Sequence, residues 1–220
     1  MSATVLRPLG RPRMRGWLHV WAFAVSVAAG ATLIAVVAAT RGSRPGLATA
    51  VYAVTVSLLF GTSALYHRIA WTPTWRAVMA RIDHSMIFVF IAGTYTPFAV
   101  LALPSTAGRV VLIVVWVGAV AGVMLKAAWL SAPRGLSVPL YLALGWVAVF
   151  VLPDLLWFGG VAALVLLLVG GLLYTAGAVV YAVRRPDPVP HVFGFHEVFH
   201  LCTVVAATCH YIAVWLAAYA

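Results

Sequence analysis

Residues 159–183 read GGVAALVLLLVGGLLYTAGAVVYAV, a run of 25 residues without a charged side chain. About 20 predominantly apolar residues are enough for a helix to cross a bilayer, so this stretch predicts a transmembrane helix. The whole chain is of the same kind, because 65% of its 220 residues are hydrophobic, 8% are charged and the mean hydropathy is +1.07. A soluble domain carries roughly 25% charged residues. The composition therefore excludes a water-soluble globule and indicates an all-α integral membrane protein.

Seven apolar runs of this kind follow one another along the chain and predict a seven-transmembrane helix bundle. Breaks rich in Arg, Gly and Pro separate them. The first run is too long for the apolar region of a signal peptide and has no small-residue cleavage site before Arg41, so we expect a retained helix. We expect residues 1–16 to form a basic cytoplasmic tail and residues 17–220 the bundle. The runs cover residues 17–40, 46–67, 82–103, 108–130, 135–152, 159–183 and 195–218.

The basic residues are unevenly divided between the two sides of this predicted bundle. Eleven Lys and Arg fall on the side of the N-terminal tail, and three fall on the opposite side. Cytoplasmic loops carry the excess of basic residues, so we expect a cytoplasmic N-terminus and an external C-terminus. The cations form no patch with interleaved aromatic residues. Membrane topology thus explains the net charge of +10, and nucleic acid is not an expected partner.

Four acidic residues occur in the chain, and two of them, Asp83 and Glu197, fall inside apolar runs. An ionisable residue within a spanning helix is costly unless it has a partner, which makes it a functional candidate. His67 ends the second run, while His196 and His200 open the seventh. In the predicted topology, these three histidines and Asp83 share one depth near the cytoplasmic face.

The spacing of these residues is typical of a zinc site. His196 and His200 are four residues apart, which places both imidazoles on one helical face, and Ser63 and His67 have the same spacing. Three neutral imidazoles with one open position form a common catalytic zinc arrangement. We therefore expect His67, His196 and His200 to bind zinc. Asp83 is then the partner of the metal-bound water or, as an alternative, a direct ligand, and the Ser63 hydroxyl hydrogen-bonds nearby.

The other histidines fit simpler roles. His19 and His191 are expected to be interfacial or to make helix-to-helix hydrogen bonds, and His210 to make a deeper packing or polar contact. His84 projects about 100° from Asp83 on the helix, so we expect it not to share the same inward direction.

A second interpretation of the seventh run remains open. His196-Glu-Val-Phe-His200 matches the H-E-x-x-H pattern, in which the Glu is the base of a metalloprotease. That interpretation predicts Glu197, and not Asp83, as the sensitive carboxylate.

The chain resembles the hemolysin III family, the bacterial branch of the progestin and adipoQ receptor proteins, from about residue 17 to its end. This resemblance implies a seven-helix bundle in the bacterial inner membrane. It also implies zinc held by the three motif histidines and a water between the metal and Asp83. The motifs that carry it are Ser63-Ala-Leu-Tyr-His67, Asp83-His-Ser-Met-Ile-Phe-Val-Phe-Ile-Ala-Gly-Thr-Tyr-Thr-Pro97 and His196-Glu-Val-Phe-His200.

The leading functional hypothesis is a zinc-dependent hydrolase acting on an amide or ester bond of a membrane lipid, as the ceramidase-like activity of relatives implies. Asp83 would be the base, and an acyl chain would lie between the helices. Two alternatives stay open. One is a non-enzymatic regulator of membrane homeostasis in which zinc is structural, and the other is a pore-forming cytolysin. Membrane lipids are the expected partners.

Overall fold

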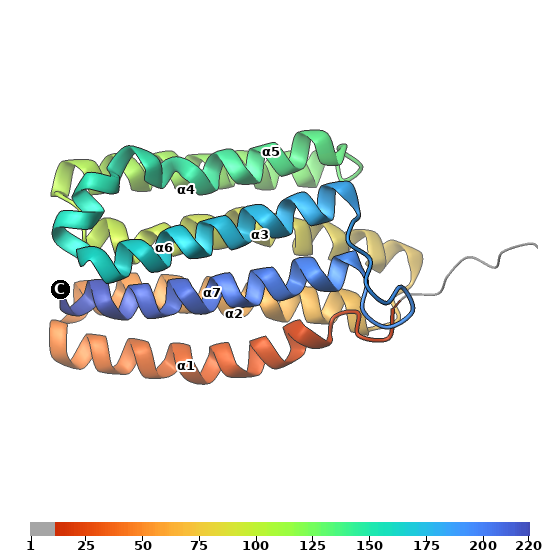
Figure 1. Ribbon diagram of the computed structural model, residues 1–220, viewed down its shortest axis with the longest axis horizontal. Coiled ribbons are helices and arrows are strands. Elements are labelled where there is room, and N and C mark those ends of the chain that lie inside the picture. Colours follow the sequence, from red (N-terminus) through yellow and green to blue (C-terminus); the bar gives the residue numbers. More distant parts are fainter. Residues whose placement is uncertain (1–11) are drawn as a thin grey trace, which may run out of the picture.

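The computed structural model describes residues 12–220, whose regular elements are all helices, as predicted. The helices lie side by side along the long axis of the molecule (Figure 1). Residues 1–11, which include Arg7 and Arg11 of the expected basic tail, lie outside the described residues. The elements are α1 (Trp17–Arg41), α2 (Ser43–Arg68), α3 (Pro73–Leu101), α4 (Ser105–Ala128), α5 (Arg134–Gly145), the 3-10 helix η1 (Trp146–Val151), α6 (Leu152–Val183) and α7 (Phe195–Tyr219).

Six segments of the described chain are long and apolar enough to cross a membrane. Five are the single helices α1, α2, α3, α4 and α7, and the sixth is the 50-residue segment Arg134–Val183, which joins α5, η1 and α6. The expected fifth run, residues 135–152, is not a separate span by this measure, because α5 ends after 12 residues and tightens into η1. The backbone of α6 leaves helical geometry at Gly160, where φ is 80°. The chain turns back between α5 and α6, and these two helices lie in contact (Figure 1).

The third helix begins earlier than the apolar pattern predicts, at Pro73 and not at residue 82. The Thr72 side chain accepts a hydrogen bond from the Trp75 backbone N–H at 3.4 Å and caps the helix. Pro at the first helical position adds to this start signal, because its missing N–H would have no partner there. A polar first turn therefore precedes the apolar part of α3 and extends the helix toward the histidine-bearing end of α2.

Small residues allow the helices to approach each other closely. A methyl group added at Gly30 of α1 would lie 2.9 Å from the Ala53 Cβ of α2, and one added at Gly177 of α6 would lie 2.9 Å from the Cys202 Cβ of α7. Such contacts between small residues are typical of helix packing in membranes.

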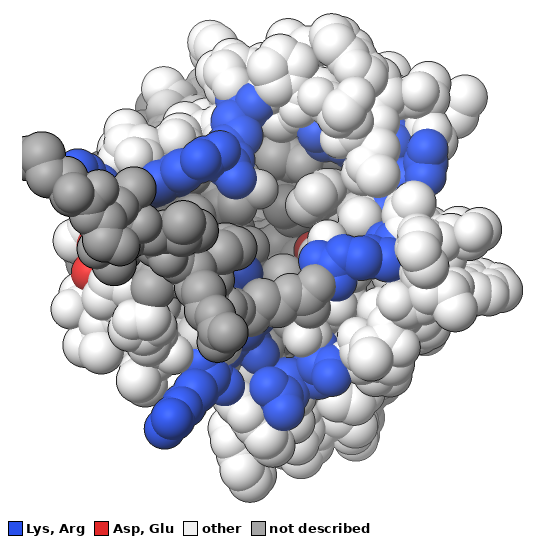
Figure 2. Space-filling view, turned by 90° about the vertical axis from the view of Figure 1, so that its right-hand side faces the viewer, with Lys and Arg blue, Asp and Glu red and all other residues white. Residues whose placement is uncertain are grey.

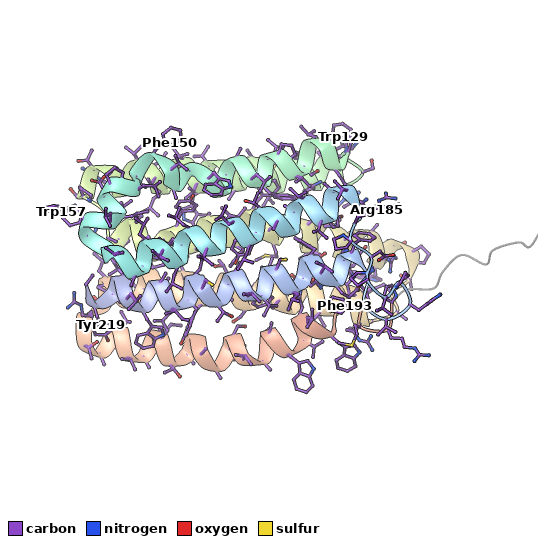
Figure 3. All side chains as sticks on the ribbon, in the orientation of Figure 1. Trp129, Phe150, Trp157, Arg185, Phe193 and Tyr219 are labelled. Atoms are coloured by element: carbon purple, nitrogen blue, oxygen red, sulfur yellow. The ribbon has the colours of Figure 1, made fainter. Side chains whose placement is uncertain are left out.

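Large apolar side chains cover the outside of the bundle. Phe150 and Trp157 are 86% and 84% exposed and point away from the helices (Figure 3). Exposed apolar surface on this scale marks an interaction with a membrane or a partner. Together with the apolar helices, it supports an all-α membrane protein.

Candidate metal centre

Three histidines from two helices lie together near one end of the bundle. His67 is in the last turn of α2, and His196 and His200 are in the first two turns of α7. Their ligand nitrogens all lie within 4.8 Å of one another. The Nε2 atoms of His67 and His196 are 3.2 Å apart. This group of imidazoles could hold a metal ion.

Two carboxylates fix the start of α7 and so the positions of its histidines. The Asp187 carboxylate accepts a hydrogen bond from the Phe195 N–H at 2.8 Å. The Glu197 carboxylate accepts one from the Gly194 N–H at 2.9 Å. Capping of this kind satisfies backbone donors that have no partner inside the helix. With the helix start fixed, the four-residue spacing brings the rings of His196 and His200 to 4.5 Å between centroids.

A cavity of about 300 Å³ lies beside the histidines, and most of its wall is apolar or aromatic. Asp83 and Ser63 line it together with His196 and His200. Both are buried, with Asp83 9% and Ser63 3% exposed, and the Ser63 hydroxyl is within reach of a hydrogen bond to the Asp83 carboxylate. The carboxylate from α3 therefore faces the same space as two of the imidazoles from α7.

Glu197 lies on the same helix as the histidines but has other partners. It is 1% exposed, forms an ion pair with Arg15 through Oε1, and accepts the Gly194 N–H through Oε2. It is not among the residues that line the cavity. The metalloprotease interpretation needs this carboxylate beside the metal, so the arrangement does not favour it.

His19 is the residue that sequence reasoning missed. It was expected to be interfacial or to make a helix-to-helix hydrogen bond, but it is 3% exposed and stacks on His200, with centroids 3.7 Å apart and an interplanar angle of 8°. Within residues 12–220, neither of its ring nitrogens has a hydrogen-bond partner. Its place at the start of α1 sets it at the same depth as the other histidines. This shared depth is the signal from which His19 could have been predicted to lie near the site.

Of the remaining histidines, His84 corrects an expectation, His210 agrees with one, and the expectation for His191 stays a prediction. His84 lines the cavity beside Asp83, so the expectation that it does not share the inward direction is wrong. His210 Nε2 lies 3.2 Å from the Leu167 carbonyl oxygen, which is a deeper polar contact. His191 is exposed in the connection before α7.

Basic side chains are spread around the end of the molecule that carries this site (Figure 2). The described start of the chain packs against this end, because the backbone N–H groups of Arg13 and Met14 donate to the carbonyls of His191 and Val192, each at 3.0 Å. This pairing positions Arg15 beside Glu197.

Fold and site together define a class: an all-helical, multi-pass membrane protein with a histidine cluster beside a cavity at one end of its bundle. The chain belongs to the family of haemolysin-III-related proteins, whose sequence pattern it matches over residues 9–211. This match confirms the resemblance to the hemolysin III family.

Two bacterial relatives agree with this assignment. The chain is 35% identical over 135 residues to "Hemolysin-3 homolog" of Bacillus subtilis (strain 168), covering 61% of this chain and 63% of the relative. It is 32% identical over 146 residues to "Hemolysin-3" of Bacillus cereus, covering 64% of this chain and 66% of the relative. The matched part thus spans just under two thirds of each relative's length.

Proposed function

We propose that this protein is a zinc-dependent hydrolase that acts on an amide or ester bond of a membrane lipid. The observation that carries the proposal is the convergence of three imidazoles and the Asp83 carboxylate beside a mostly apolar cavity. Groups suited to hydrolysis and a space suited to an acyl chain therefore occur together inside a membrane protein.

The histidine cluster suits zinc in chemistry, and one pair of its nitrogens lies close to the separation that zinc requires. Zn–N bonds of about 2.0–2.1 Å in a tetrahedral site place two ligand nitrogens roughly 3.4 Å apart. The separation of 3.2 Å between the Nε2 atoms of His67 and His196 is close to this value. His200 Nδ1 is buried and has no hydrogen-bond partner within the described chain. A bound metal would give such a ring a role that compensates for its burial.

Each residue of the site has a distinct part in the proposed reaction. His67, His196 and His200 would hold the zinc, which would supply Lewis acidity when bound. The Asp83 carboxylate accepts the proton of the attacking water, and the Ser63 hydroxyl holds this carboxylate in place. The apolar walls of the cavity bind the acyl chain and keep bulk water away from the scissile bond.

We further propose seven membrane crossings with the histidine cluster at the cytoplasmic face. The segment Arg134–Val183 has 50 residues, and a single helix of that length would be about 75 Å long, far more than a bilayer core of about 30 Å. Its break at Gly160 is a suitable place for the chain to turn back. The basic end of the bundle (Figure 2) would face the cytoplasm by the positive-inside rule, in a bacterium at the inner membrane.

The direct test uses the purified full-length protein loaded with zinc. It is incubated with N-acyl sphingoid bases and with diacyl phospholipids, and released fatty acid is measured by mass spectrometry. We expect release by the wild type, loss in Asp83→Asn and after chelation, and no change in His191→Ala, whose side chain is exposed in a connection. No release from any of these lipids by the zinc-loaded wild type would contradict the proposal.

A structural metal is the second candidate, and the placement of the cluster favours it. His67 lies on α2, while His196 and His200 lie on α7, and these two helices otherwise contact each other sparingly. A metal at this place would link them, as a closed structural site does. Chelation would then lower the melting temperature of the wild type without altering the lipids of cells that express it.

The names of the two Bacillus relatives favour a third candidate, a membrane pore. Dye leakage from liposomes at low protein density tests it, in the wild type and in His200→Ala. Leakage that is the same in both proteins would support a pore and would separate it from any function of the histidine cluster.

A further inference from the structure

Two cations lie on the wall of the cavity that His196 and His200 also line. Lys126 in the last turn of α4 and Arg134 at the start of α5 both line it, as does Ser137. Lys126 is 3% exposed, and its Nζ donates a hydrogen bond to the Ser137 Oγ at 2.5 Å. The Arg134 guanidinium lies over the Tyr181 ring, 4.7 Å from its centroid. Ammonium, guanidinium and hydroxyl groups from two helices therefore line one cavity.

No carboxylate neutralises these two cations within residues 12–220. The one ion pair there with an N···O distance of 4.0 Å or less joins Arg15 and Glu197. Asp83 shares the cavity but lies beyond that distance from both cations. An ammonium has three N–H donors, and Lys126 uses one of them on Ser137. A buried cation without a counter-charge is costly, so the cavity favours an anionic ligand.

The remaining walls of the cavity favour an anion that carries an acyl chain. An inorganic anion would gain nothing from apolar walls, whereas an acyl chain buries its surface against them. Basic pockets between transmembrane helices bind anionic lipid headgroups, and a set of cationic donors with a hydroxyl suits the several oxygens of a phosphate. Apolar and aromatic residues on these walls include Ile87, Phe90, Ile91, Leu130, Tyr141 and Leu142.

We propose that Lys126, Arg134 and Ser137 form a headgroup subsite for the phosphate of an anionic membrane phospholipid, whose acyl chain occupies the cavity. The subsite and Asp83 line the same cavity. A phospholipid held here has its acyl-ester region in the same cavity as Asp83. The inference deepens the proposed function by naming the substrate class, and it rests on that function for the reaction but not for the binding.

Native mass spectrometry of the full-length protein in detergent tests the headgroup subsite. The probes are phosphatidylglycerol, phosphatidylcholine, palmitate and inorganic phosphate. We expect the wild type to bind phosphatidylglycerol in preference to the other three. Lys126→Met is expected to reduce this preference about tenfold or more, because a charge-assisted hydrogen bond is lost. Arg76→Gln is the matched control, since Arg76 belongs to the same end of the bundle but does not line the cavity.

Further variants test whether the charge of Lys126 and the other two residues of the subsite are needed. Lys126→Arg retains the charge and is expected to keep the preference for phosphatidylglycerol. If Lys126→Met does not fold, Ser137→Ala and Arg134→Gln are measured in the same way and should each weaken the preference. An unaltered preference in the folded variants would overturn the subsite, as would tighter binding of palmitate or equal binding of inorganic phosphate.

The same measurements separate this inference from the proposed function. Selective binding of phosphatidylglycerol without any lipid hydrolysis would reject the hydrolase and leave the subsite standing. Zinc-dependent hydrolysis combined with normal binding by Lys126→Met would reject the subsite and leave the hydrolase standing.

Discussion

Asp83 and Glu197 are both buried carboxylates at the same end of the bundle, but their surroundings differ. Glu197 has an Arg15 ion pair on one oxygen and a backbone N–H on the other, so it completes the start of α7. Asp83 faces the cavity, with the Ser63 hydroxyl within hydrogen-bonding reach. Glu197 therefore has partners for both oxygens inside the protein, while Asp83 keeps access to the space beside the histidines.

The partners of a buried acid inside an apolar run indicate its role. Burial makes either residue a functional candidate, because an ionisable group in a membrane helix is costly without a partner. The partner then separates the two roles. An acid that caps a helix and pairs with an arginine is accounted for by stability, whereas an acid directed at a cavity is available for chemistry.

The largest expected effect distinguishes the two carboxylates by activity. Asp83→Asn should lower lipid hydrolysis by about 10²–10⁴-fold, the usual contribution of a general base. Glu197→Gln should leave turnover close to that of the wild type, because the amide oxygen still accepts the Gly194 N–H. Fatty acid release by zinc-loaded proteins measures both. Loss of activity in Glu197→Gln with full activity in Asp83→Asn would reverse the assignment and make Glu197 the base, as the H-E-x-x-H pattern predicts.

The proposed role of Asp83 requires a metal, and the three histidines are its expected ligands. His67→Ala and His200→Ala should each weaken zinc binding by more than about 100-fold, the upper limit for residues that only support a ligand. Elemental analysis after dialysis against a zinc buffer gives the stoichiometry. His191→Ala is the control and should retain the wild-type zinc content. Full zinc content in both His67→Ala and His200→Ala would show that the cluster is not the metal site.

A smaller effect is expected on the free energy of unfolding, and it concerns Glu197. Breaking a buried ion pair costs about 3–5 kcal/mol, and because Arg15 is 18% exposed we expect about 1–3 kcal/mol for Glu197→Gln. Thermal unfolding in detergent measures the loss, and a double-mutant cycle with Arg15→Gln isolates the pair. Arg13→Gln, at an exposed position in the same segment, should have little effect. Additive losses in the cycle would show that the ion pair contributes nothing.

Much of the fold could be predicted from the sequence, because apolar runs long enough to cross a bilayer have few other structures available. The predictions fail where backbone signals and hydropathy disagree. α3 begins at Pro73 because Thr72 caps it, although its first turns carry Arg76 and Arg81. The expected fifth run is divided between α5 and η1, since nothing in its hydropathy marks the end of α5 at Gly145.

The candidate site was predictable to the extent that it depends on helix spacing and depth. His196 and His200 are on one face by spacing, and depth places His67 and Asp83 near them. The partner of Glu197 was not predictable, because Arg15 reaches it only through backbone pairing of the N-terminal segment with the connection before α7. The stacking of His19 on His200 depends in the same way on how α1 packs against α7.

The smallest expected effect applies the same comparison to two stacked histidines. His200 is an expected ligand, while His19 lies against it with both ring nitrogens lacking a hydrogen-bond partner in the described chain. If His19 only packs, His19→Phe keeps an aromatic ring in contact with His200 and Phe60 and removes two buried polar atoms. We expect a change in stability of no more than about 1 kcal/mol, in the stabilising direction, and an unchanged zinc content. His200→Phe is the matched comparison and should lose the metal. Loss of zinc in His19→Phe as well would place His19 within the metal site. His19 could then no longer be assigned to packing and His200 alone to the metal.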